Sequence, residues 1–435
     1  MGGSSRKTNM AYPNLISGRV AACTIVSRNY AAYAKTLQES MRISNPDIDF
    51  FVLIVDRKDP KFEGQSGLDN LIWVEDLGIP DFYHLAFKFD ILELNTDVKP
   101  FMLTQLASRY EYVFYLDPDI YVYGSMQGLV DRLANQTAII TPHAISPIDD
   151  EMKPSEVDFM RAGIYNLGFF GARSCPESNR LLDWWGQRCT ELGYNDSRQG
   201  LFVDQKFIDL VPSFFSDVVI ERSPVYNVAY WNLHERHVDA SDPSHPTVNG
   251  MPLVFFHFSG LSVEPPSESR LEISKYQNRS NFGNRPDVKP LFDHYRTKLV
   301  EHGHRDLRSL TYGFGSFSNG ERINGVSRRL YGLVADRFDS SIDPFDVKGP
   351  VYILLSEMHA LGGGPAHETP STYNAHKHSR AMRIMQRLLR LAFRVLGSER
   401  YGLLMAYFGH IASIRNQRDI FFTNEQMYKT PPNDL

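Results

Sequence analysis

Residues 112–124 read YVFYLDPDIYVYG, a run of β-branched and aromatic residues interrupted by Asp117-Pro118-Asp119. The run predicts a buried strand that ends at Pro118, because proline has no backbone N–H to donate to a neighbouring strand. Side chains two residues apart on an extended chain share a face, so the carboxylates of Asp117 and Asp119 can converge on one point. Paired hard oxygen ligands beside a phosphate are typical of a Mg²⁺ or Mn²⁺ site. The alternative is an Asp-Pro turn that only closes a core strand.

Alternating strands and helices surround this stretch. We expect strands at 19–26, 50–55, 71–74 and 136–141, and helices at 29–43 and at 82–110 with a break at Lys99-Pro100. A strand, a helix and a strand at this spacing form a βαβ unit and predict a parallel sheet. Ligands of such sheets collect at the carboxyl ends of the strands, where Asn29, Tyr30 and Asp56 should join the two aspartates. Alternatively, Asn29 only caps its helix and Tyr30 packs against it.

Polar residues also interrupt three later segments. They are Asn166 and Gly168 in a strand at 163–172, Asp204 and Gln205 at the start of a helix, and His257 in a strand at 253–258. Glycine within a strand indicates a bulge or a close approach of backbone. An ordinary structural explanation exists as well, because an aspartate in a first turn favours the helix dipole and a histidine in an apolar strand is usually a core residue.

The composition is that of a globular chain of two or three domains. Hydrophobic residues make up 42% and charged residues 22% of the 435 residues, which are ordinary globular values. The net charge of −5 argues against nucleic acid as the main partner. The three cysteines form no CxxC pair, and we read them as reduced thiols. Without a secretory signal or an apolar stretch of about 20 residues, the chain is expected in the cytoplasm, free or on the inner face of the cell membrane.

Taken in their order along the chain, these residues resemble the motifs of one family. From residue 19 to about 262 the chain is similar to the GT-A glycosyltransferases of family 8, the group of glycogenin and the bacterial lipooligosaccharide galactosyltransferases. The resemblance rests on short segments in the family's order: NYAAY at 29–33, DPD at 117–119, YNLG at 165–168, DQ at 204–205 and HFSG at 257–260. It implies an α/β fold with a mixed, mainly parallel sheet flanked by helices. It also implies an enzyme, a hexosyltransferase that uses a nucleotide-sugar.

The resemblance assigns roles to individual residues. It implies that Asp117, Asp119 and His257 hold Mn²⁺ or Mg²⁺. The donor, a UDP-sugar, would be bound by Asn29, Tyr30, Asp56, Lys99, Asn166, Gly168 and Gly260. Among catalytic residues, Gln205 would stabilise the oxocarbenium ion, Asp204 would bind sugar hydroxyls, and Lys99 would face the diphosphate. Together these roles imply a retaining transfer by front-face attack to a glycan or lipid-linked acceptor in cell-surface polysaccharide synthesis.

One departure from the family pattern concerns the phosphate charge. The family's lysine after the HxxG segment is missing, since Val263 stands in its place. Lys99, Arg28 and Lys275 are the candidates to meet that charge instead. The open alternatives are an inverting transferase, a GDP- or dTDP-sugar donor, and a catalytically inactive module that binds glycan or nucleotide as a scaffold.

The sequence predicts three regions: a mobile tail at 1–18, a catalytic domain at 19–265, and a mainly helical region at 266–435 for acceptor, oligomer or membrane contact. In the last region, the apolar run at 351–355 is expected to form a short strand or a buried turn. A basic helix is expected at 379–396, and its arginines fall within roughly 80° of one another. They are Arg380, Arg383, Arg387, Arg390 and Arg394. Either this helix packs in a core with its arginines solvated or paired, or it docks on an anionic membrane.

Overall fold

The computed structural model describes residues 16–264, 271–362 and 380–422. These residues form two compact units that interleave along the sequence, one from 16–79 and 91–312 and the other from 80–90 and 313–422. Most of the expected tail lies outside the described residues, but 16–18 already belong to the first strand. The expected domain division at 265 stays a prediction.

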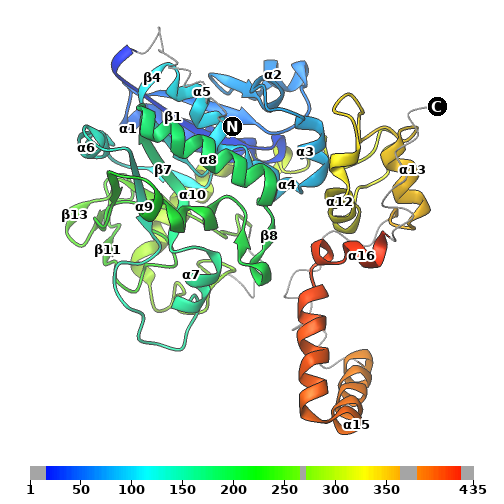
Figure 1. Cartoon of the computed structure of the whole chain (residues 1–435). Helices are drawn as coiled ribbons and strands as arrows, with labels where there is room; N and C mark the ends of the chain where they lie inside the picture. Colours follow the sequence, from blue (N-terminus) through cyan, green and yellow to red (C-terminus); the bar gives the residue numbers. More distant parts are fainter. Residues whose placement is uncertain (1–15, 265–270, 363–379, 423–435) are drawn as a thin grey trace, which may run out of the picture. The chain divides into compact units, whose positions relative to one another are not determined.

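A seven-stranded mixed sheet forms the centre of the first unit (Figure 1). Its order is β10-β6-β7-β4-β1-β2-β3, and every pair is parallel except the two that β7 makes with β4 and β6. The strands are β1 (Ile16–Val26), β2 (Asp49–Ile54), β3 (Leu71–Trp73), β4 (Tyr110–Leu116), β6 (Ala138–Pro142), β7 (Tyr165–Arg173) and β10 (Val218–Ile220). This sheet confirms the predicted α/β class.

Helices cover both faces of the sheet, which explains why β4 is apolar on both sides (Figure 1). On one face, Phe114 belongs to a core shared with Leu37 of α1 (Ala31–Ser44) and Tyr295 of α10 (Lys289–Glu301). On the other face, Phe170 packs on Trp185 of α8 (Pro176–Leu192) with their rings 5.1 Å apart, and α5 (Lys99–Ala107) lies between α8 and β4. The predicted helix at 82–110 is divided into α3 (Phe82–Lys88), α4 (Ile91–Asp97) and α5.

A short antiparallel pair outside the central sheet positions the DPD segment. After β4 ends at Leu116, β5 (Ile120–Val122) pairs with β14 (Phe255–His257), and Ile120 lies opposite His257. The predicted strand at 253–258 is therefore present as β14, but it lies outside the central sheet and pairs only with β5 among the described strands. Smaller elements complete the unit: α2 (Pro60–Ser66), α6 (Gln127–Leu133), α7 (Glu156–Ala162), α9 (Val211–Phe214), α11 (His304–Leu307), β8 (Asn195–Asp196), β9 (Leu201–Phe202), β11 (Val238–Asp239), β12 (Thr247–Val248) and β13 (Met251–Pro252).

The second unit is mainly helical, as predicted. It contains α3, α12 (Gly325–Gly332), α13 (Pro350–Glu357), α15 (Arg380–Ile411) and α16 (Arg418–Phe421). The buried Arg328 of α12 donates hydrogen bonds to the carbonyls of Ala86, Phe87 and Phe89, which fixes the end of α3. The prediction of a strand or turn at 351–355 was wrong, because Pro350 starts a helix there.

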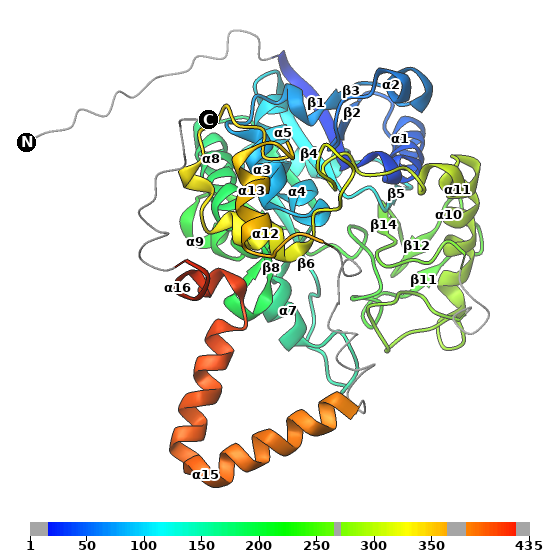
Figure 2. The ribbon, with the colours of Figure 1, turned by 90° about the vertical axis from the view of Figure 1, so that its right-hand side faces the viewer.

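Helix α15 extends past the predicted end at 396. The chain bends at Gly397, which has φ 75° and ψ 172°, and the helix then continues to Ile411 (Figure 2). None of the side chains described on α15 is buried, so the alternative of a core helix does not hold. Among the described residues, no helix combines the length and apolar character needed to cross a bilayer.

Candidate metal centre

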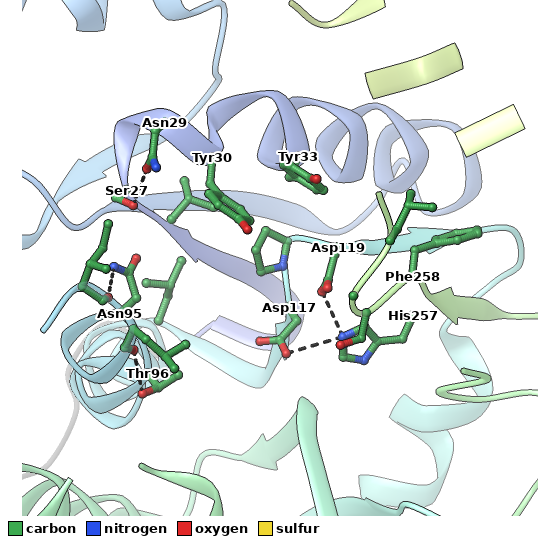
Figure 3. Close-up of a pocket in the computed structure, with 18 of the residues that line it drawn as sticks. Ser27, Asn29, Tyr30, Tyr33, Asn95, Thr96, Asp117, Asp119, His257 and Phe258 are labelled. Atoms are coloured by element: carbon green, nitrogen blue, oxygen red, sulfur yellow. Dashed lines mark hydrogen bonds and ion pairs between the residues drawn. The ribbon is translucent and has the colours of Figure 1, made fainter. Parts of the chain in front are cut away.

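A cavity of about 430 Å³ opens in the first unit where β1 and β4 end (Figure 3). Its walls come from the end of β1, the turn η1 (Arg28–Tyr30), α1, α4, the DPD segment, the HFSG segment, and the pair Lys275 and Tyr276. Ligands of parallel sheets are expected at this edge. The cavity therefore lies where the sequence predicted a site.

Asp117, Asp119 and His257 converge on one wall of the cavity (Figure 3). His257 Nε2 lies 2.9 Å from Asp119 Oδ1 and 3.7 Å from Asp117 Oδ2. One ligand atom from each residue lies within 4.8 Å of the others. The backbone fixes this arrangement, because Asp117 N–H donates to Gly168 O at 2.8 Å and Phe258 N–H donates to Asp119 O at 2.8 Å.

The three side chains also fit a divalent cation by their chemistry. The two carboxylates are oxygen ligands of the kind that Mn²⁺ and Mg²⁺ take, and the imidazole of His257 offers a nitrogen ligand beside them. Burial raises the pKa of Asp117, although Lys99 and His257 oppose the rise. Burial lowers the pKa of His257, but Asp119 and Asp117 outweigh it, and the pKa is raised overall. The carboxylates thus attract a proton to His257, and a bound cation would replace that proton.

Asn227 orients His257 from behind. Its Oδ1 lies 3.2 Å from His257 Nδ1, so Nδ1 carries the hydrogen and Nε2 faces the carboxylates. The Asn227 amide donates to Thr141 Oγ1 and to Asn166 Oδ1, both at 2.9 Å. Asn166, expected to touch the donor, is buried in this network and does not line the cavity. No sequence motif marks Asn227, so its place behind His257 could not be predicted.

Two glycines allow the close packing around the site. A Cβ on Gly168 would lie 2.3 Å from His257 Cε1, which confirms the close backbone approach predicted for this strand. The register between β6 and β7 also shifts next to it, at Thr141. Gly260 has φ 74°, and a Cβ there would lie 2.3 Å from Ser274 Oγ. Gly168 lies against the His257 ring, whereas Gly260 lines the cavity.

Asn29 and Tyr30 both line the cavity. Tyr30 is 47% exposed as a residue, and one face of its ring stacks on Tyr33 with the centroids 4.8 Å apart, so the other face is available to a flat ligand. Asn29 accepts a hydrogen bond from Ser27 Oγ at 2.7 Å, and its side chain makes no capping bond to α1. The alternative that Asn29 only caps its helix therefore fails.

Lys275 is the one lysine or arginine among the described residues that line the cavity. Arg28 is held elsewhere, since its guanidinium lies 3.1 Å from Asp56 Oδ2 and 2.7 Å from Asp59 Oδ2. Asp56 is fully buried in that contact and does not line the cavity. Of Lys99, Arg28 and Lys275, the three candidates to face the diphosphate of the donor, Lys275 is the one that lines the cavity.

The expected catalytic residues Lys99 and Asp204 form a buried ion pair behind the cavity wall. Lys99 Nζ lies 2.7 Å from Asp204 Oδ2, donates to Leu167 O at 2.9 Å, and lies 4.1 Å from the centre of the Tyr115 ring. Tyr115 in turn donates to Asp117 Oδ1 at 2.6 Å. Neither member of the pair lines the cavity.

Gln205 also lies outside the cavity lining. Its amide accepts from Leu167 N–H and donates to Ala162 O, both at 3.0 Å. The amide therefore holds the segment before Gly168 in place. The catalytic roles expected for Gln205, Asp204 and Lys99 stay predictions.

No family model matches the sequence. The chain is 22% identical over 306 residues to the uncharacterized protein YfnF of Bacillus subtilis, with 69% of this chain and 97% of YfnF covered. It is 25% identical over 255 residues to the uncharacterized protein YfnD of the same organism, with 57% of this chain and 80% of YfnD covered. Similar solved structures include the galactosyltransferase LgtC in complex with donor and acceptor sugar analogues. The match has 16% identity, covers 65% of this chain and 95% of LgtC, and has a TM-score of 0.39. A glycosyltransferase involved in glycosylation of the major capsid of PBCV-1 matches with 13% identity, over 56% of this chain and 94% of that enzyme, with a TM-score of 0.33.

Proposed function

We propose that this protein is a metal-dependent glycosyltransferase that moves a sugar from a nucleotide-sugar, UDP-linked by preference, to a glycan or lipid-linked acceptor. The observation that carries the proposal is the convergence of Asp117, Asp119 and His257 in a cavity that also presents Lys275 and Tyr30. Cation ligands, a positive charge and an exposed aromatic ring are what a nucleoside diphosphate requires. A volume of about 430 Å³ lies within the usual range of sites for small ligands.

Asp117, Asp119 and His257 would hold the cation. When bound, a divalent ion stabilises negative charge on the leaving diphosphate as a Lewis acid. Lys275 would contribute a second positive charge to the same phosphates and so take over from the lysine missing at position 263. Its backbone N–H donates to Gly260 O at 3.3 Å, which ties it to the HFSG segment that also carries His257.

Tyr30 and Asn29 would recognise the base. Stacking of a base on an aromatic side chain is worth about 1–3 kcal/mol and does not discriminate strongly between bases. Selection of uracil would therefore depend on hydrogen bonds from polar groups such as Asn29, as the family resemblance implies. The cell-surface polysaccharide expected as the product's destination stays a prediction.

We further propose that transfer retains the anomeric configuration. An inverting transferase needs a carboxylate or another base to deprotonate the acceptor. Among the described residues that line the cavity, Asp117 and Asp119 are the only carboxylates, and both are assigned to the cation. NMR of the product anomer tests this proposal directly, and an inverted product would contradict it.

A thermal-shift panel of nucleotides with Mn²⁺ or with EDTA tests the binding part of the proposal. A ligand at 100 times its Kd stabilises a protein by about 2.7 kcal/mol, so a shift should be easy to see. We expect UDP to stabilise the protein more than GDP, dTDP or CMP, and only with Mn²⁺. Asp119→Asn should lose the shift, whereas the exposed Asp183→Asn should keep it. Equal shifts in EDTA would contradict the metal assignment.

Hydrolysis of the donor separates an enzyme from an inactive binding module. We expect slow, Mn²⁺-dependent release of UDP from one or more UDP-sugars in the absence of acceptor. UDP binding without hydrolysis of any sugar in a broad panel, with or without added glycans, would favour the scaffold alternative.

A further inference from the structure

Helix α15 forms a bent, two-armed element, here called the α15 hairpin (Arg380–Ile411) (Figure 2). Its first arm ends at the Gly397 bend and its second arm runs on to Ile411. The arms meet near the bend, where the rings of Phe393 and Tyr401 contact each other edge to face at 5.2 Å. Neither arm buries a side chain among those described, although both are rich in apolar residues.

The hairpin is strongly basic. It carries six arginines and one acidic residue, Glu399. The five arginines of the first arm share one stripe of the helix, at roughly 100° per residue. No salt bridge to these arginines occurs among the described residues. Like charges in one stripe repel, so the helix would be stabilised by an anionic surface against it.

Large apolar side chains flank this stripe and continue along the second arm. On the first arm, Leu388 is 56%, Leu391 57% and Val395 73% exposed. On the second arm, Leu403 is 72% and Tyr407 53% exposed. Water-exposed apolar groups of this size on two adjacent arms indicate a surface that is covered in use.

We propose that the α15 hairpin docks in the plane of an anionic lipid surface, with its apolar side chains among the acyl chains and its arginines at the headgroups. Two observations favour lipid as the occupant. The α15 hairpin combines exposed apolar side chains with a basic stripe, which is typical of interfacial binding. The first arm, at 1.5 Å per residue, is about 25 Å long, which suits a helix lying on the surface.

A second copy of the chain is the less favourable occupant. A two-fold contact through this face would bring two arginine stripes together, with one glutamate from each copy to offset them. The docking inference does not depend on the proposed function. If both hold, the catalytic unit and a lipid-linked acceptor would share one surface.

Cosedimentation of the full-length protein with vesicles tests the inference. We expect binding at low salt to phosphatidylcholine vesicles that contain phosphatidylglycerol, and weak binding to phosphatidylcholine alone. Salt at about 1 M should release the protein, because the Debye length then falls to about 3 Å. Charge reversal in R383E/R387E/R390E should weaken binding at least about a hundredfold, since each basic residue contributes roughly a fivefold factor.

A matched control has the same change in net charge at exposed arginines of the first unit, R109E/R198E/R222E, and should keep vesicle binding. The apolar variant L403S/F408S should weaken binding without changing net charge. Equal loss in both charge variants, or no binding of the wild type to anionic vesicles at low salt, would overturn the inference. A dimer in analytical ultracentrifugation that L403S/F408S converts to monomer, without vesicle binding, would replace lipid with a second copy.

Discussion

Substituting Lys99 by methionine tests whether this residue supports the site from within the core. Lys99 and Asp204 are each 1% exposed and lie 2.7 Å apart, so solvent does not screen their interaction. Removing one partner of a buried ion pair costs about 3–5 kcal/mol, because the other charge stays buried and unpaired. We therefore expect K99M to lower the free energy of unfolding by that amount.

The double variant K99M/D204L provides the control. Replacing both partners by apolar side chains leaves no buried charge, so much of the lost stability should return. Urea unfolding followed by tryptophan fluorescence measures both variants, because all four tryptophans lie in the first unit. If the free energy of unfolding of K99M lies within about 1 kcal/mol of the wild-type value and the variant nevertheless loses turnover, Lys99 acts on the substrate. That result would contradict a supporting role for Lys99 in the core.

Three further predictions address other parts of the site. Gly168→Ala should weaken Mn²⁺ affinity about 10–100-fold in a calorimetric titration, because a Cβ would lie 2.3 Å from His257 Cε1; unchanged affinity would show that the ring can move freely. Lys275→Ala should lower kcat/KM about 10–100-fold, because the loss of one charge-assisted contact has an effect of that size. The control Lys289→Ala, on the exposed face of α10, should leave kcat/KM unchanged. Burial lowers the pKa of His143 to about 4, below the value of about 6.5 expected in the unfolded chain. As the pH falls from about 6.5 to 4, the unfolded chain therefore binds a proton that the folded protein excludes, and the free energy of unfolding should drop by about 3 kcal/mol. Urea unfolding across this pH range should show that drop in the wild type and a smaller one in His143→Gln.

The sheet and its ligand-binding edge could be predicted because both depend on local patterns. The apolar run before Asp117 and the proline after it mark the end of a buried strand, and the βαβ spacing predicts a parallel sheet. The structure then places the end of β4 beside β1. The three candidate cation ligands were predicted from the same edge together with the order of motifs in the family that the chain resembles. His257 reaches the aspartates because β14 pairs with β5, a register that places it opposite Ile120.

The partners of buried polar side chains could not be predicted in this way. Nothing in a strand or helix pattern shows that Lys99 meets Asp204, or that Asn227 lies behind His257, because these contacts join distant parts of the chain. The helix α13 was misread since an apolar run of five residues fits a strand or a helix equally well. Pro350 at its first turn was the signal that favoured a helix.

A crystal of the protein grown with Mn²⁺ and UDP, measured at the manganese absorption edge, tests the central claim most directly. The proposal predicts one anomalous peak within bonding distance of Asp117, Asp119 and His257, with the diphosphate between that ion and Lys275. UDP bound without manganese, or manganese bound away from these three residues, would contradict it.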